Sequence, residues 1–80
     1  MAKKAFHLVF MQKLIQEPIM FVVSRDCNVL LNIRRAKITA EAGEATVELE
    51  GKIEDIEKAE KMFRQKGVGV DPVIGDIVEG

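Results

Sequence analysis

The spacing of apolar residues alternates between period two and helical period along the chain, and the order of these changes constrains the fold more than any other feature. Alternation over residues 3–11, 29–38 and 45–50 predicts three strands, and the valines between 68 and 73 predict a short fourth strand. Helical spacing over residues 18–26 and 52–66 predicts two helices. The predicted order is therefore strand, helix, strand, strand, helix, strand.

Two strand–helix–strand crossovers separated by a hairpin have one common solution. Right-handed crossovers place both helices on one face of a four-stranded antiparallel sheet, with the strands in the order 4-1-3-2. We therefore predict an α+β fold, the ferredoxin-like βαββαβ sandwich, in one domain over residues 1–80. A chain of this length buries only about 60% of the surface that its unfolded form exposes. Nearly all of its apolar residues are therefore needed for a single core.

The alternation also predicts which side chains form that core. The inward residues of the two central strands are Phe6, Leu8, Phe10, Ala45, Val47 and Leu49. The outward residues include Val9 and Met11 on the first strand and Glu48 and Glu50 on the third. Two carboxylates on that face argue against an RNA-recognition module, which stacks bases on the same face of this fold, so we expect no nucleic-acid partner. The hairpin turn is predicted over 41–44, where a glycine lies.

Residues with special backbone preferences mark the ends of the predicted elements. A polar linker over 12–17 leads to Pro18, which suits the first position of a helix because the missing N–H costs nothing there. Asn28 and Gly67 are placed to end the two helices. Pro72 restricts the last strand to an edge of the sheet or to a strand end.

The second strand changes phase halfway, which a regular strand cannot do. The apolar residues of 29–33 share one phase, whereas Ala36 and Ile38 belong to the other. One extra residue would restore a common inward face. The sequence therefore predicts a β-bulge near Arg34 and Arg35.

Composition excludes several kinds of site. With one His and one Cys, the chain can form neither an internal disulfide nor a cysteine metal cluster, which favours a reducing compartment, the cytoplasm. No apolar run is long enough for a membrane span, so no membrane insertion is expected. The net charge of −1 divides into +5 over residues 1–40 (seven bases, two acids) and −6 over residues 41–80 (five bases, eleven acids). Because the two halves of so small a domain interleave, these charges largely cancel.

No set of residues in the sequence predicts catalysis. Ser24 and Cys27 share the first helix and His7 lies on the first strand, but no third partner or oxyanion loop accompanies them. Cys27 is expected to be a small buried residue at the helix end, and His7 an outward residue of the sheet. The Gly67-Val68-Gly69 segment follows a helix, which is the wrong end for a phosphate-binding loop. We expect no enzyme activity, no metal and no cofactor.

Three segments in a characteristic order resemble a known family. They are EPIMFVVSRDCNVLLNIRRAKIT over 17–39, VELEG over 47–51 and GVGV over 67–70. Together they are similar to the NIL domain, which is named for an Asn-Ile-Leu triplet in its second strand, and the resemblance covers residues 4–74. In this chain Arg34 follows Asn32 and Ile33 in place of the leucine, and Phe21-Val22 is apolar where polar residues are expected on the first helix.

The resemblance implies the same ferredoxin-like fold and a regulatory role. NIL domains form the C-terminus of methionine-importer ATPase subunits, where they bind the transported amino acid and inhibit uptake. They also precede a small iron–sulfur ferredoxin module, and Asp76-Ile77-Val78 resembles the ending of the domain in that second group.

A ligand site is predicted at Asn32, Ile33, Arg34 and Arg35, for methionine or a related amino acid. The Asn32 amide offers both a donor and an acceptor, and the bulge leaves backbone groups to meet the ammonium and carboxylate of the ligand. Two plainer interpretations stay open. In the first, Asn32 holds the bulge by bonding the local backbone. In the second, Arg34, Arg35 and Lys37 form a solvated edge, and the functional alternative for these cations is an edge that binds a carboxylate or an acidic partner surface.

Exposed apolar residues predict a homodimer. Val9, Met11 and Leu30 are expected on the open face of the sheet and Phe21 on an uncovered helix face. The leading prediction for function is a non-catalytic regulatory domain that binds a small amino acid. The alternative is a protein-interaction module that docks on or orients an iron–sulfur or sulfur-metabolism partner. That partner would be a ferredoxin-type protein or a fused module.

Overall fold

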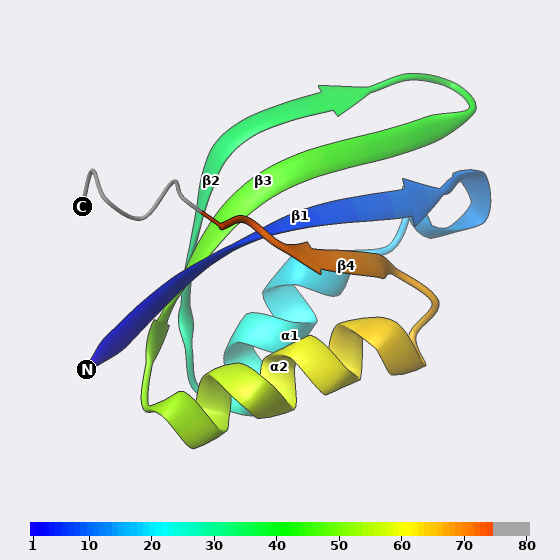
Figure 1. Cartoon of the computed structure of the whole chain (residues 1–80). Coiled ribbons are helices and arrows are strands. Elements are labelled where there is room, and N and C mark those ends of the chain that lie inside the picture. The colour runs from blue at the N-terminus through cyan, green and yellow to red at the C-terminus, as the bar shows by residue number, and fades with distance from the viewer. Residues whose placement is uncertain (75–80) are drawn as a thin grey trace.

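The computed structural model describes residues 1–74 and confirms the predicted fold. The elements are β1 (Ala2–Met11), the 3-10 helix η1 (Gln12–Leu14), α1 (Ile19–Cys27), β2 (Leu30–Ile38), β3 (Ala42–Gly51), α2 (Ile53–Gln65) and β4 (Gly69–Pro72). The strands pair antiparallel in the order β2-β3-β1-β4, which is the predicted order read from the other edge. Both helices cover one face of the sheet and leave the other face open (Figure 1).

The hydrophobic core fills the space between the sheet and the helices. All the predicted inward residues of the central strands are buried, namely Phe6, Leu8, Phe10, Ala45, Val47 and Leu49. The helices complete the core with Ile19, Val23 and Cys27 from α1 and Ile56, Ala59 and Phe63 from α2. These helical residues are spaced three or four apart, so each helix presents one apolar stripe to the sheet.

The helices end where the sequence predicts. Asn28 follows α1 with φ 58° and ψ 47°, and Gly67 lies just beyond α2 with φ 93°, so both residues adopt the left-handed conformation. Pro18 precedes the first helical residue, Ile19, instead of being the first helical residue itself. The difference of one residue leaves the role of the proline at the helix start unchanged.

The predicted bulge is present in β2. The pairing with β3 shifts between Ile33 and Arg35, so Arg34 is the extra residue. Because of this shift, Ala36 and Ile38 face the helix layer, as Ile33 does.

The hairpin turn lies earlier than predicted, and the position 41–44 is wrong. β3 already begins at Ala42, so Gly43 is a strand residue. The Thr39 hydroxyl accepts hydrogen bonds from the backbone N–H groups of Ala42 at 3.2 Å and Glu41 at 3.3 Å, and the Thr39 N–H donates to the Ala42 carbonyl at 2.8 Å. The side chain of threonine thus organises a turn that needs no glycine.

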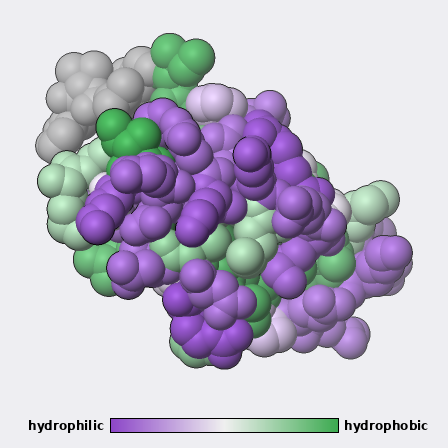
Figure 2. All heavy atoms as spheres, turned by 90° about the horizontal axis from the view of Figure 1, so that it is seen from below, coloured by the Kyte–Doolittle hydropathy of each residue, from purple (hydrophilic) through white to green (hydrophobic). Residues whose placement is uncertain are grey.

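The two edge strands of the sheet are unlike each other. β4 is a four-residue strand that ends at Pro72, as predicted, and its Val70 is buried. β2 has nine residues, and all except Leu31 are exposed. Ile33 points toward the helix layer as predicted, yet it is 53% exposed because β2 lies at the edge of the sheet, beyond the cover of the helices. Seen from the helix side, the surface is largely hydrophilic, with smaller hydrophobic areas between the charged side chains (Figure 2).

Candidate functional site

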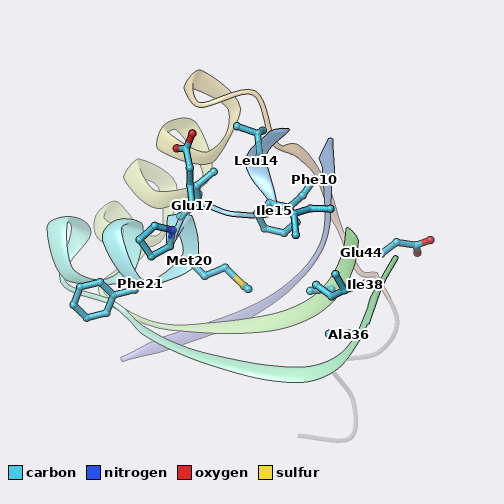
Figure 3. A pocket seen from close by; sticks show the side chains of 12 residues that line it. Phe10, Leu14, Ile15, Glu17, Met20, Phe21, Ala36, Ile38 and Glu44 are labelled. Atoms are coloured by element: carbon cyan, nitrogen blue, oxygen red, sulfur yellow. The ribbon is translucent and has the colours of Figure 1, made fainter. Parts of the chain in front are cut away.

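An apolar pocket of about 230 Å³ lies between α1 and the far end of the β2–β3 hairpin (Figure 3). The 12–18 connection, the first turn of α1 and the ends of β1, β2 and β3 form its walls. Its apolar lining includes Phe10, Leu14, Ile15, Met20, Ala36 and Ile38. Glu17 and Glu44 also border the pocket, with their carboxylates turned away from it in Figure 3. The pocket is therefore suited to a small apolar group.

The pocket owes its space to a glycine and to the path of the 12–18 connection. η1 turns the chain back so that Leu14 is buried and Ile15 is half-buried against the core. Across from them, Gly43 has no side chain. A Cβ at this position would lie 3.4 Å from Ile38 Cδ1 and 3.8 Å from Ile15 Cγ1, which are both groups of the pocket wall. A larger residue at 43 would thus occupy space beside the pocket.

The pocket borders the free edge of the sheet. Ala36 and Ile38 belong to β2, which has no strand on its outer side within residues 1–74. An edge strand presents a row of backbone N–H and C=O groups without strand partners. Apolar walls and polar backbone groups therefore meet at one place.

The bulge has a second effect, on the opposite face of the sheet. Consecutive residues of a regular strand point to opposite faces, but Arg34 and Arg35 both border one hollow of about 410 Å³ on the open face, together with Thr46 and Val73. The Arg34 Nε lies 3.6 Å from Oε2 of Glu48. The bulge therefore gathers two guanidinium groups above the sheet.

His7 lies on this open face, as predicted. Its Nδ1 is 3.4 Å from the Thr46 hydroxyl and its Nε2 is 3.3 Å from Oε1 of Glu44. With Arg35 and Lys37, these residues border a second hollow of about 260 Å³. This part of the open face is thus polar and carries charges of both signs, whereas the apolar pocket lies on the helix side.

The four predicted ligand residues are divided between the two faces of β2. Asn32 is exposed and pairs with Glu48, so it lies on the open face with Arg34 and Arg35, whereas Ile33 points toward the helix layer. None of the four lines the apolar pocket. The structure therefore places them near the pocket along the strand but not in its wall.

Sequence reasoning missed the residues that do form the wall. Leu14 and Ile15 lie in the segment predicted as a polar linker, and Met20 lies between the buried positions of α1. Two consecutive apolar residues just before Pro18 were the signal available in the sequence. They indicate a connection that packs against the core, which a solvated linker would not do.

The four predicted interface residues are exposed, as expected, but they do not form one patch. Met11 and Leu30 pair with opposite ends of β3, so Val9 and Met11 lie far from Leu30 on the open face. Phe21 lies on α1, where the Arg25 guanidinium is 5.5 Å from the centre of its ring. The homodimer stays a prediction, with Val9 and Met11 at one end of the open face, Leu30 at the other end and Phe21 on the helix side.

Cys27 is a packing residue, as predicted. It is buried, and its Sγ lies 4.0 Å from the Met62 sulfur. Burial raises the pKa of the thiol, and the neighbouring Asp26 carboxylate raises it further. A raised pKa lowers the thiolate fraction at neutral pH, which opposes a nucleophilic role.

Within residues 1–74, no three His, Cys, Asp or Glu side chains gather closely enough to hold a metal ion. In the same part of the chain, no helix is long and apolar enough to cross a membrane. The segment Asp76-Ile77-Val78, which suggested the ferredoxin-linked group, lies outside the described residues.

The fold and the pocket define a small ferredoxin-like domain with an apolar pocket beside an edge strand of the sheet. The chain belongs to the NIL domain family, whose model matches residues 4–72. A similar solved structure is the C-terminal domain of an ABC transporter/ATP-binding protein from Enterococcus faecalis, with a TM-score of 0.77 at 20% sequence identity, covering 90% of this chain and 84% of that chain. At this identity the likeness shows the fold. No curated protein matches this chain in sequence.

Proposed function

We propose that this chain is a non-catalytic regulatory domain of the cytoplasm that binds a small amino acid with an apolar side chain, methionine or a close relative. The observation that carries the proposal is the apolar pocket beside the free edge of β2. Membership of the NIL family supports it, because the resemblance implies amino-acid binding and regulation.

The size and lining of the pocket support one apolar side chain as the ligand group. Its volume of about 230 Å³ is below the roughly 300–1,000 Å³ of sites for drug-sized molecules. Burying apolar surface stabilises a complex by about 25 cal/mol per Å². An acidic side chain would lose its hydration in this pocket without gaining a partner, because the charged residues at its border, Glu17 and Glu44, carry the same sign of charge.

The charged ends of an amino acid would need partners outside the pocket. The backbone of β2 beside Ala36 offers N–H donors and C=O acceptors at the edge. Asn32 and Arg35 lie on the same strand toward the open face, and Arg35 makes no ion pair within residues 1–74. A ligand whose side chain fills the pocket would meet these two groups only by reaching around the edge.

The experiment is a calorimetric titration with methionine of the parent and two variants. We expect saturable binding by the parent and its loss in Ala36→Phe, because the ring would fill the pocket. Ala40→Phe is the matched control, since Ala40 lies on the exposed hairpin turn and does not line the pocket. Asn32→Ala should weaken binding by about 1–3 kcal/mol if this amide holds a charged end of the ligand.

Two results would contradict the proposal. One is the lack of any heat at millimolar methionine while circular dichroism shows a folded protein. The other is equal binding of methionine and glutamate, because an apolar pocket should reject the charged side chain. Norleucine, which keeps the length and apolar character of the side chain, should compete with methionine.

The second candidate function, a protein-interaction module, has an observation of its own. Ile33 and Ile38, both on the helix side of β2, are each more than half exposed, and exposed apolar patches usually mark interfaces. In this function the partner would be an iron–sulfur or sulfur-metabolism protein, as the resemblance to NIL–ferredoxin proteins implies. Lack of methionine binding would favour this candidate.

A further inference from the structure

The free edge of β2 has the features of a docking site for an extended chain. It is nine residues long, it contains no proline, and eight of its residues are exposed. Long exposed edge strands readily pair with another chain. In recognition by strand addition, backbone hydrogen bonds supply affinity and pockets for alternate side chains supply specificity. Here a pocket lined by Ala36 and Ile38 opens on the helix side of this same edge.

The charge on β2 indicates what kind of chain would pair with it. Arg34, Arg35 and Lys37 are exposed, and β2 contains no acidic residue. On its inner side, Lys37 pairs with Glu44 of β3, and Arg34 lies 3.6 Å from Glu48. An outer strand would complete this pattern of charge if it placed acidic residues on the open face.

A second copy of β2 does not satisfy this pattern. Antiparallel pairing of two β2 strands would bring arginines and a lysine opposite one another, and like charges directly opposite each other destabilise a sheet. Cations and a bulge on an edge strand are also known means of preventing self-pairing. The same cations attract an acidic strand.

We propose that the edge of β2 docks an extended acidic segment of a partner protein as a fifth strand, with an apolar side chain of that segment in the pocket of Figure 3. Side chains of a strand alternate between the faces of a sheet. Acidic residues of the segment therefore face Arg35 and Lys37 on the open face, while its apolar residues face Ile38 on the helix side. This inference goes beyond amino-acid binding and does not depend on it.

The test uses a synthetic peptide about as long as β2, in which glutamate alternates with valine and leucine. The control peptide has lysine in place of each glutamate. The parent protein, labelled with nitrogen-15, is titrated with each peptide and its amide NMR signals are followed. We expect saturable shifts over residues 33–38 with the acidic peptide only, weakening as salt is added, and no shifts over β4.

Two charge-reversal variants test whether peptide binding depends on the charge of β2 or only on the net charge of the protein. Arg35→Glu should weaken binding of the acidic peptide by roughly threefold to tenfold, because attraction across the strand pair becomes repulsion. Lys61→Glu makes the same change of charge on the exposed side of α2 and should leave binding unchanged. Ala36→Phe should also weaken binding of the acidic peptide, because the ring would fill the pocket.

Several outcomes would overturn the proposal. They are the absence of shifts with the acidic peptide, equal binding of both peptides, and equal weakening by Arg35→Glu and Lys61→Glu. Shifts of β2 signals on dilution of the protein alone would assign the edge to a second copy instead. Because methionine is not used, a failure of the amino-acid proposal and a failure of this one are measured separately.

Discussion

The two edges of the sheet differ in length, burial and charge. β4 is four residues long, ends at Pro72, and carries a valine that is only 7% exposed. β2 is nine residues long, carries three cations, and leaves Ile38 59% exposed. The fold therefore closes one edge and leaves the other available, and the apolar pocket lies beside the available edge.

This difference has a physical basis in how each strand is held. Val70 of β4 packs into the core, and the proline beyond it has no N–H to offer a further strand. β2 is held mainly by its pairing with β3, because the helices cover little of it. A strand with this little packing keeps its outer groups free for binding, at a small cost to stability.

The largest expected effect on the free energy of unfolding comes from removing apolar atoms from an edge strand. We expect Val70→Ala to lower the free energy of unfolding by about 1–3 kcal/mol, because it empties part of the core. Ile33→Ala removes more atoms but should cost less than about 1 kcal/mol, because that side chain is 53% exposed. Urea denaturation measures both losses of unfolding free energy. A larger loss for Ile33→Ala than for Val70→Ala would contradict the stated difference between the two edges.

Filling the space beside the pocket should have an intermediate effect. Gly43→Ala should raise the free energy of unfolding by about 0.4–1 kcal/mol, since the nearest atom to its new methyl group is the end of the Ile38 side chain, at 3.4 Å, and the next lies at 3.8 Å on Ile15. Gly51→Ala, at the other end of β3, is the matched control. Its Cβ would lie 3.3 Å from Val29 Cγ1 and 3.5 Å from the Asn28 carbonyl oxygen, so it should be the less stable variant in thermal unfolding.

In Gly43→Ala, stability and ligand binding are expected to change in opposite directions. Gly43→Ala should bind methionine and the acidic peptide more weakly although it is more stable, because the methyl group narrows the space between Ile15 and Ile38. Unchanged binding in the stabilised variant would show that this space is not used.

The smallest effect on folding is expected from a test of the homodimer. Met11→Glu changes a side chain that is 63% exposed and should alter stability by no more than about 0.5 kcal/mol. If two copies pair through Val9 and Met11 on the open face, light scattering should give a dimer for the parent and a monomer for this variant. Ile33→Glu on the edge of β2 should then leave the dimer intact, and a monomeric parent at high micromolar concentration would contradict the prediction.

The sequence predicts those parts of the fold that depend on periodicity. β1, β3 and α2 each have one clearly buried set of positions, and the change of phase in β2 required the bulge at Arg34. Periodicity predicts the direction of a side chain but not whether anything covers it, which is why Ile33 points inward and is still exposed. The turn at Thr39 was missed because a hydroxyl, and not a glycine, organises it.

The pocket could not be predicted for a related reason. It depends on where the 12–18 connection lies against the hairpin, and this is set by contacts between residues far apart in the sequence, such as Ile15 and Gly43. The family resemblance directed attention to the Asn32 triplet, whereas the apolar walls come from other segments. Only the tertiary structure brings those segments together.

Because the pairing of β2 with β3 passes over Arg34, this position can be changed or lost without altering the register of the strand. Most substitutions at 34 would leave the neighbouring side chains on their present faces. Loss of Arg34 itself would remove the bulge and make β2 a regular strand, with Ala36 and Ile38 still toward the helices and Arg35 and Lys37 still on the open face. A single codon deletion at 34 would thus keep the apolar wall of the pocket and remove one of the two guanidinium groups above the sheet, so we expect relatives that keep the pocket to occur both with and without this residue.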